Sequence, residues 1–382
     1  MQSEIRFGIV GCGLMGKEFA SAAARWCHLD EDLPRPVITA VCDPNQAATT
    51  WFKNNFATIK LITTDYKQLL ASNQVDAVYC AVPHDLHADV YIDVINAGKH
   101  LLGEKPFGIN QKANKRIMEA VSQHPEVLVR SSSEYPFAPA VQRLCNMIDN
   151  KIFGHIIQVD AGFMHSSDLD PGKPINWKRI VLKNGEYGCM GDLGMHVCHV
   201  PFRSGWKPQN VRAILTKVYN ERPDGKGKNV ACETWDNATM FCEAIDPVCG
   251  QPFPMTLKTQ RIAPGETNTW YLSILGTRNS ARFSTKNINI LEIMPYTPGG
   301  EQNWQVVDIG HPTAFKSITG GIFEFGFSDS ILQMWAAFIY ELTYGKVKNK
   351  FAGCVRPEET ELSHRLFTCA LESQRTGKCI QL

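Results

Sequence analysis

The chain has 382 residues, of which 44% are hydrophobic and 20% charged, with a formal net charge of +1 at pH 7. This is the composition of an ordinary globular protein long enough for two domains. The balanced charge and the lack of a long basic run argue against a nucleic-acid partner, and no apolar run approaches the ~18 residues of a transmembrane helix.

The N-terminal residues and the cysteines both favour a cytoplasmic location. No charged segment followed by an apolar run opens the chain, so we expect no signal peptide and a cytoplasmic protein without a membrane partner. The thirteen cysteines are scattered and form no C-x-x-C pair, which favours reduced thiols in a reducing compartment.

In the first third of the chain, short apolar runs alternate with helical patterns. Strands are predicted at 5–10, 37–42, 77–82, 100–103 and 127–130, and helices at 15–26, 46–56, 65–70, 86–97 and 111–122. Asp65 is a suitable N-cap and Gly98 a suitable helix stop. Such alternation predicts right-handed βαβ units and a parallel sheet, in a domain spanning 1–131.

The remainder of the chain, 132–382, has a different pattern. One more helix is predicted at 138–149, followed by strands at 155–163, 211–219, 238–243, 255–261, 270–275, 281–284, 288–294 and 304–307, and by helices at 328–344 and 357–373. The Gly- and Lys-rich stretch 221–228 is expected to be an exposed loop. We therefore predict an α/β protein: a Rossmann domain, then a second α/β domain with a large, mainly antiparallel open sheet.

A glycine motif, Gly11-x-Gly13-x-x-Gly16, follows the first strand and opens the first helix. The first glycine permits the tight turn, the second permits close approach of a pyrophosphate, and the third permits helix–strand packing. The phosphates would lie at the helix N-terminus, where free N–H groups point outward. In this context the motif predicts a dinucleotide site.

Asp43 ends the second predicted strand, where a carboxylate takes the ribose hydroxyls of NAD. It would repel the 2′-phosphate of NADP, and Pro44 and Asn45 supply no cation, so NAD is favoured and NADP stays open. Asp43 could equally begin a turn before Pro44, and both roles are compatible.

Glu104-Lys105-Pro106 follows the predicted strand 100–103. Ligands of such sheets bind beyond the carboxyl ends of the strands, so these side chains should lie near a nicotinamide. A lysine there can hydrogen-bond and polarise a substrate hydroxyl and, when partly desolvated, relay a proton. The alternative is a solvated surface lysine.

A second polar cluster is formed by Asp192, His196 and His199. Asp192 and His196 are four residues apart and share a face if the segment is helical. A carboxylate beside an imidazole can orient it and tune its basicity. A capped helix start is one alternative. A zinc site is another, but no fourth ligand is evident, so no metal is expected.

Together these motifs resemble the Gfo/Idh/MocA family, which includes glucose–fructose oxidoreductase and inositol dehydrogenase. The resemblance covers almost the whole chain and extends to Pro83-x-x-x-His87 and to Leu275-Gly276-Thr277. It implies oxidation of a sugar, sugar-derivative or cyclitol hydroxyl, or the reverse reduction. It also implies a homo-oligomer, dimer or tetramer, assembled through the C-terminal sheet.

The resemblance assigns roles to individual residues. Lys105 would hold the substrate hydroxyl before a cis peptide at Pro106, Asp192 would bind substrate and support His196, and His196 would be the general acid/base, a role the family shares variably with the lysine. The cofactor-binding set would be Gly11, Gly13, Leu14, Met15, Gly16, Asp43, Val82, Pro83, His87, Glu104 and Lys105.

Two departures from the family pattern lie near the expected substrate pocket. His199 stands where family members often carry Asp, and Ser131–Tyr135 replaces a common Asn/Arg-type segment. We therefore expect substrate contacts from Glu134, Tyr135, Trp177 and His199. For Trp177, as for Trp235 beside Asp236, a place in the core is the favoured interpretation, because a buried tryptophan more often belongs to a core than to a sugar site.

Three functions are compatible with these residues. The first is an NAD-dependent dehydrogenase or reductase of CH–OH groups. The second is a glycosidase that keeps its NAD bound and oxidises its substrate transiently. The third is a non-catalytic dinucleotide-binding regulator, against which the retention of Lys105, Asp192 and His196 argues.

Overall fold

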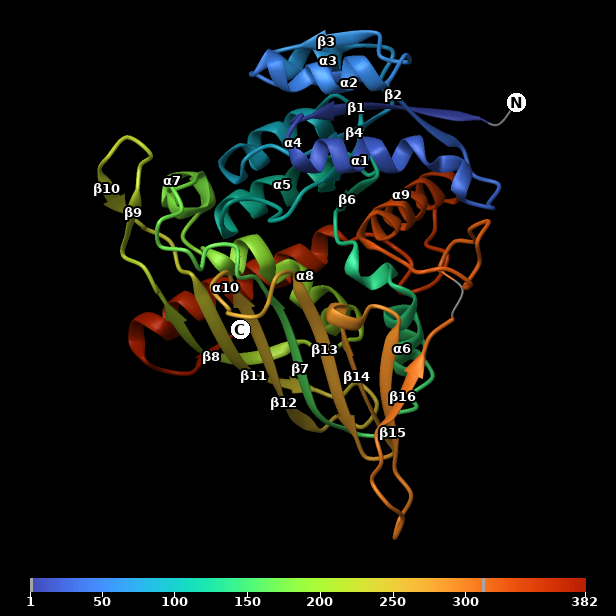
Figure 1. Ribbon diagram of the computed structural model, residues 1–382, viewed down its shortest axis with the longest axis vertical. Coiled ribbons are helices and arrows are strands. Elements are labelled where there is room, and N and C mark those ends of the chain that lie inside the picture. Colours follow the sequence, from blue (N-terminus) through green and yellow to red (C-terminus); the bar gives the residue numbers. More distant parts are fainter. Residues whose placement is uncertain (1–2, 311–312) are drawn as a thin grey trace. The chain divides into compact units, whose positions relative to one another are not determined.

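The computed structural model describes residues 3–310 and 313–382, which separate into two compact units (Figure 1). Residues 3–108, 112–137 and 313–358 form the first unit, and residues 109–111, 138–310 and 359–382 form the second. The predicted boundary at 131 therefore delimits the Rossmann sheet but not the whole first unit, which also takes in a segment from late in the chain.

The first unit contains a six-stranded parallel sheet in the order β3-β2-β1-β4-β5-β6. Its strands are β1 (Glu4–Val10), β2 (Arg35–Cys42), β3 (Leu61–Thr63), β4 (Ala77–Cys80), β5 (His100–Gly103) and β6 (Val129–Ser131). This is the strand order of a dinucleotide-binding Rossmann fold. The sequence analysis missed β3, because three residues carry too little periodicity to be recognised.

Helices complete the first unit. They are α1 (Leu14–Ala24), α2 (Thr50–Asn55), α3 (Tyr66–Ala71), α4 (His87–Asn96), α5 (Gln111–Gln123) and α9 (Phe327–Tyr344). Asp65 caps α3 as predicted, accepting a hydrogen bond from Lys67 N at 2.9 Å. Helix α9, red-orange in Figure 1, lies beside α1: the Trp335 ring stacks on Phe19 with centroids 3.7 Å apart, and its Nε1 donates to Phe19 O at 3.0 Å.

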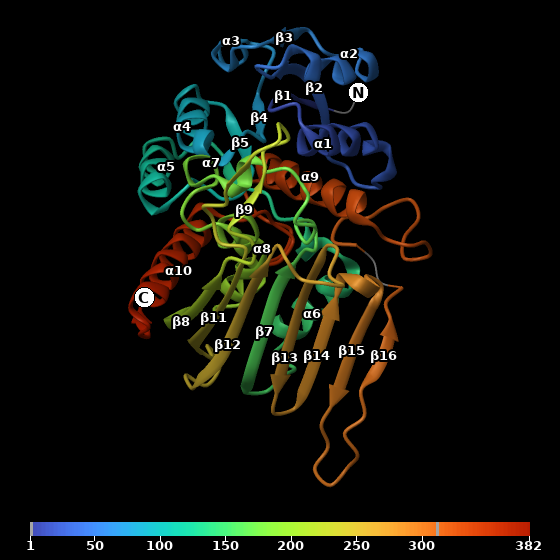
Figure 2. The ribbon, with the colours of Figure 1, turned by 60° about the vertical axis from the view of Figure 1, so that its left-hand side comes forward.

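The second unit is built on a nine-stranded sheet in the order β16-β15-β14-β13-β7-β12-β11-β8-β17 (Figure 2). Its strands are β7 (Ile156–Met164), β8 (Pro208–Thr216), β11 (Asn237–Ile245), β12 (Pro252–Gln260), β13 (Thr269–Gly276), β14 (Asn279–Ser284), β15 (Ile290–Pro295), β16 (Gln305–Asp308) and β17 (Ile380–Gln381). Most neighbours are antiparallel, but β7 and β12 run parallel. The predicted fold class is confirmed.

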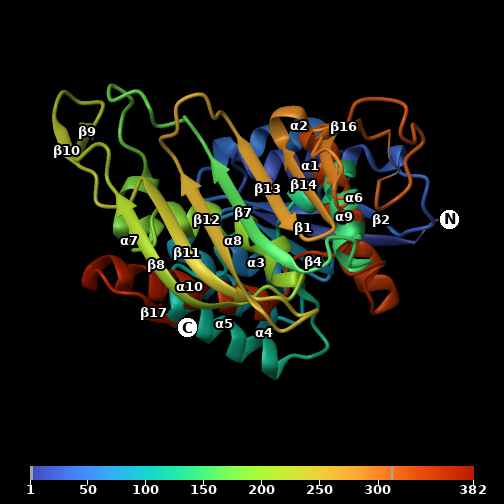
Figure 3. The ribbon, with the colours of Figure 1, turned by 90° about the horizontal axis from the view of Figure 1, so that it is seen from below.

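One face of this sheet is covered by helices. The second unit contains α6 (Pro139–Asp149), α7 (Val181–Asn184), α8 (Cys189–Arg203) and α10 (Pro357–Thr376). Figure 3 shows α8 and α10 behind the same side of the sheet. One side of the sheet carries buried side chains, such as Met240 of β11, which is fully buried. On the opposite side Phe241 and Ile214 are 53% and 52% exposed, so the sheet alternates between a core face and an open face.

The stretch 221–228, predicted to be a loop, is partly a hairpin. β9 (Glu221–Pro223) pairs with β10 (Asn229–Ala231), and only the turn between them is irregular. The Asp224 carboxylate accepts hydrogen bonds from the backbone N–H groups of Lys226 and Lys228, which stabilises that turn. The Gly and Lys content correctly predicted the turn but gave no indication of the two short strands.

All thirteen cysteines are unbridged, in agreement with the predicted thiols. Within residues 3–310 and 313–382, no helix has both the length and the apolar character required to span a bilayer.

Candidate functional site

The glycine loop connects β1 to α1 in the first unit. Gly11 has φ +99°, and a Cβ there would lie 2.5 Å from Ala81 O. A Cβ on Gly16 would collide with Gly11 O, so both positions require glycine. A Cβ on Gly13 would meet nothing within 4 Å, which leaves open space over the N-terminus of α1. This is the geometry that a pyrophosphate requires.

Asp43 lies directly after β2 and joins two loops. Its Oδ2 accepts from Cys12 N at 2.8 Å, within the glycine loop, and its Oδ1 accepts from Asn45 N at 2.8 Å. It therefore begins a turn and also lies beside the glycine loop, which is compatible with both predicted roles. A half-buried carboxylate with further lone pairs suits the ribose hydroxyls of NAD.

His87 connects the two segments that follow β4 and β5. Its Nε2 lies 2.9 Å from Val82 O and its Nδ1 lies 2.5 Å from Pro106 O. Burial lowers the pKa of this imidazole, and its contacts with the two carbonyl oxygens oppose that shift. The Lys105–Pro106 peptide is cis, which confirms the expectation from the resemblance.

Glu104 is anchored at the carboxyl end of β5. Its Oε1 accepts from Tyr79 Oη at 2.8 Å and from Ser132 Oγ at 2.7 Å, and its carbonyl oxygen accepts from Tyr91 Oη at 2.6 Å. The neighbouring Lys105 and the buried Glu134 belong to the same unit. The first unit thus gathers two carboxyls, a lysine and two phenols where its strands end.

The other predicted cluster lies on helix α8 of the second unit. Asp192, His196 and His199 are 1%, 4% and 2% exposed. The His196 ring meets Phe163 edge-on with centroids 5.4 Å apart, and its carbonyl oxygen accepts from Trp270 Nε1 at 2.9 Å. Asp192 and His196 are thus one helical turn apart, as predicted.

Two cations hold the Asp192 carboxylate. Lys178 Nζ donates to its Oδ1 at 2.9 Å and to its Oδ2 at 3.0 Å, and Arg261 Nη1 also donates to Oδ2. Lys178 follows Trp177, with its ammonium 5.6 Å from the centre of the indole. The second unit therefore brings together Asp192 and the segment that includes the predicted substrate contact Trp177.

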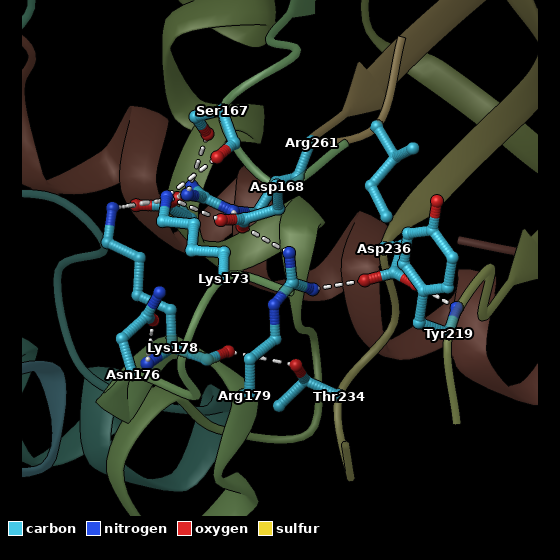
Figure 4. A network of polar contacts seen from close by, with 12 residues as sticks. Ser167, Asp168, Lys173, Asn176, Lys178, Arg179, Tyr219, Thr234, Asp236 and Arg261 are labelled. Atoms are coloured by element: carbon cyan, nitrogen blue, oxygen red, sulfur yellow. Dashed lines mark hydrogen bonds and ion pairs between the residues drawn. The ribbon is translucent and has the colours of Figure 1, made fainter. Parts of the chain in front are cut away.

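Arg261 extends this contact into a buried charge network (Figure 4). Its Nε donates to Asp168 Oδ2 at 2.9 Å. Asp168 also accepts from Arg179, whose second terminal nitrogen donates to Asp236. Burial raises the pKa of Asp168, but Arg261 and Arg179 outweigh it and hold that pKa well below its usual range.

The sheet register explains why these charges meet. Because β7 and β12 run parallel, the segments that follow them leave the same edge of the sheet, where His165 N donates to Gln260 O at 2.7 Å. Asp236 precedes the antiparallel β11 at that edge, and Arg261 N donates to its carbonyl oxygen at 2.9 Å. Arg261, Asp168 and Arg179 were missed by the sequence analysis, because their contacts bridge distant segments and follow no local spacing.

His199 differs from its neighbours in lacking a polar partner. Neither ring nitrogen has a hydrogen-bond partner within the described residues. Burial, with Arg203 adding to it, lowers the pKa of this imidazole well below the usual value. The structure thus places His199 as a neutral ring inside the second unit, and its predicted contact with substrate stays a prediction.

The predicted residues are distributed over both units. Lys105, Glu134 and Tyr135 belong to the first, and Trp177, Asp192, His196 and His199 belong to the second. Tyr135 is 6% exposed in a short helical turn after β6. In the described part of the chain, no three His, Cys, Asp or Glu side chains gather as a metal site would require.

Comparison with known proteins agrees with this geometry. Residues 5–131 match the Gfo/Idh/MocA oxidoreductase family with its NAD-binding Rossmann fold. Levoglucosan dehydrogenase of Pseudarthrobacter phenanthrenivorans is 23% identical over 337 residues, which are 80% of this chain and 84% of that enzyme. Inositol 2-dehydrogenase of Agrobacterium fabrum is 26% identical over 170 residues, which are 44% of this chain and 47% of that enzyme.

The fold likeness extends over the full length. The solved structure of levoglucosan dehydrogenase in complex with NADH and L-sorbose aligns with a TM-score of 0.85 at 21% identity and covers 99% of both chains. Residues 5–131 are therefore an NAD-binding Rossmann domain that matches the Gfo/Idh/MocA oxidoreductase family, and the chain as a whole shares the fold of levoglucosan dehydrogenase.

Proposed function

We propose that the protein is an NAD-dependent dehydrogenase or reductase that acts on a CH–OH group of a sugar, sugar derivative or cyclitol. The observation that carries this proposal is the buried pair of Asp192 and His196, with Asp192 held by Lys178 and Arg261, in a chain with an NAD-binding domain. The named activities of the levoglucosan and inositol dehydrogenases support the substrate class.

The first unit would hold the cofactor. The proposed binding residues are Gly11, Gly13, Leu14, Met15, Gly16, Asp43, Val82, Pro83, His87, Glu104 and Lys105. When bound, NAD accepts a hydride from the substrate carbon or, as NADH, returns it. The Asp43 carboxylate supports a preference for NAD over NADP, because it would repel a 2′-phosphate.

Three residues would serve the substrate hydroxyl. Lys105 holds it by a hydrogen bond, Asp192 binds substrate and orients His196, and the proton goes to His196 or to Lys105. Asp192 suits positioning better than proton transfer, because two cations already satisfy its oxygens. Tyr135, Trp177 and His199 stay candidates for contacts with the rest of the substrate.

We also propose a homo-oligomer, dimer or tetramer, that assembles through the open face of the nine-stranded sheet. Phe241 and Ile214 on adjacent strands expose about half of their surface there, and such apolar side chains favour contact with a second copy. Light scattering of the purified protein tests this, and a monomer at micromolar concentration would contradict it.

The function is tested by following nicotinamide absorbance with a panel of sugars, anhydrosugars and inositols, including levoglucosan. We expect stoichiometric NADH from at least one of them. Lys105→Met and His196→Asn should each lower kcat/KM by roughly 10²–10⁴, the range of general acid–base catalysis. Lys286→Met, which removes a half-exposed surface ion pair, is the control. The absence of turnover on every compound would overturn the proposal.

A further inference from the structure

Glu134 is a second carboxyl group near Lys105, and the function proposed above does not require it. It lies just after β6, whose Ser131 pairs in parallel register with Gly103 of β5. Ser132, two residues before Glu134, donates its N–H to Gly103 O at 2.9 Å and its hydroxyl to the Glu104 carboxylate at 2.7 Å. The chain is therefore bound to the Glu104 segment immediately before Glu134.

Glu134 is 5% exposed, and its surroundings set its charge. Burial and the charge of Glu104 raise the pKa of Glu134 to about 7, and the Lys105 ammonium opposes this. A carboxyl group with that pKa exchanges protons at neutral pH, which an ordinary glutamate does not.

Several other titratable groups of this region are not placed to exchange protons near pH 7. Burial and Glu104 raise the pKa of Tyr79 well above its usual value, and burial raises the pKa of Cys80 to about 12. Arg130 of β6 and Glu341 of α9 form a bidentate ion pair with hydrogen bonds of 2.8 and 2.6 Å, so their charges cancel. Burial lowers the pKa of His87, whose ring lies between two carbonyl oxygens.

We propose that Glu134 exchanges the substrate proton with Lys105, so that the proton of the oxidised hydroxyl leaves through this pair. The inference rests on the proposed function and chooses Lys105 over His196 as the first proton acceptor. In oxidation, the Lys105 ammonium first gives a proton to the Glu134 carboxylate, and the amine that results takes the proton of the substrate hydroxyl, while the substrate carbon would give its hydride to bound NAD⁺. Glu134 releases its proton to solvent, so Lys105 ends as the ammonium with which it began and one proton is released. Reduction follows the same steps backward.

The electrostatic coupling between Glu134 and Lys105 can be tested without enzyme turnover. Isotope-edited infrared spectroscopy follows the carbonyl band of protonated carboxyls against pH, and Glu134→Gln assigns the band that belongs to Glu134. We expect this band to titrate near pH 7 in the wild type and at higher pH in Lys105→Met, because the opposing positive charge is gone. An unchanged midpoint in Lys105→Met would show that the two groups are not coupled and would overturn the relay.

Turnover measurements test the transfer itself. Glu134→Gln should lower kcat roughly 10²-fold and remove an inflection near pH 7, whereas Glu119→Gln, at an exposed position of α5, should change neither. Formate should restore part of the rate of Glu134→Ala in a concentration-dependent manner, which a purely structural residue would not allow. If Glu134→Gln keeps the wild-type kcat and pH profile, the proton relay is wrong, but the proposed dehydrogenase activity is unaffected. No turnover by the wild type would overturn the dehydrogenase and with it the relay, whatever the infrared result.

Discussion

The two units place carboxyl groups in opposite electrostatic surroundings. In the first, Glu134 is buried beside another carboxyl, Glu104, and burial with that negative charge raises its pKa to about 7. In the second, Asp168 is equally buried, but two guanidinium groups hold its pKa well below the usual range. Burial alone therefore does not decide the protonation state of a carboxyl group; the sign of the neighbouring charge does.

The largest expected effect concerns the charge network of the second unit. Arg179 is fully buried between Asp168 and Asp236. Arg179→Met should lower the free energy of unfolding by about 3–5 kcal/mol, because both carboxylates lose a buried partner. Urea unfolding measures this. Arg375→Met, which removes a surface ion pair with Glu372, is the matched control and should change stability by less than about 1 kcal/mol. If both variants lowered the free energy of unfolding equally, burial would not be what makes the Arg179 ion pairs important for stability.

The next prediction concerns Glu134 and the pH dependence of stability. Its folded pKa of about 7 lies above the ordinary value of 4.5, so the unfolded chain loses this proton first. The group's contribution to stability is present below pH 4.5 and is lost as pH rises to about 7, at up to ~1.4 kcal/mol per pH unit. Glu134→Gln should remove that slope and Glu119→Gln should keep it, as measured by thermal unfolding across the pH range. An unchanged slope in Glu134→Gln would contradict the surroundings described for this carboxyl.

His199 extends the comparison to a buried ring that has no hydrogen-bond partner among the residues the structure describes. Its pKa is well below the ordinary 6.5, so protonation favours the unfolded chain, and stability present above pH 6.5 is lost as pH falls below it. His199→Leu should remove this loss and, near pH 7.5, raise the free energy of unfolding by about 1–3 kcal/mol. Chemical denaturation at pH 5.5 and 7.5 tests both parts. If His199→Leu instead destabilises the protein at both values, the imidazole has a partner.

Asp43 represents a third environment, in which peptide N–H groups satisfy the carboxylate. Asp43→Ser should reduce the preference for NAD over NADP by about tenfold, equivalent to ~1.4 kcal/mol, since it removes the charge that would repel a 2′-phosphate. The ratio of the two dissociation constants, measured by fluorescence quenching, tests this. Glu119→Ser is the control, and an unaltered ratio in Asp43→Ser would remove Asp43 from the cofactor site.

Much of the candidate site was accessible from the sequence because its signals are local. The glycine loop, Asp43 and the segment Glu104–Lys105–Pro106 each follow a strand. Those strands can be recognised in the sequence as short apolar runs or by side chains that alternate between apolar and polar. The α8 cluster was found by its four-residue spacing. Strand β3 was missed because it is too short for any periodicity, and the 221–231 hairpin because its turn residues outweigh its strands.

By itself, the sequence determined the Rossmann domain, the glycine loop after its first strand, the two polar clusters and the α/β class, since each depends on residues close together along the chain. Only the tertiary structure decided what surrounds those residues. Arg261 reaches Asp168 across 93 positions and Asp192 across 69, and both contacts depend on the parallel register of β7 and β12, which no local pattern encodes. The same holds for Glu134, whose charge follows from the alignment of β6 with β5. Charge states are set by distances in space, and these exist only once the sheets have formed.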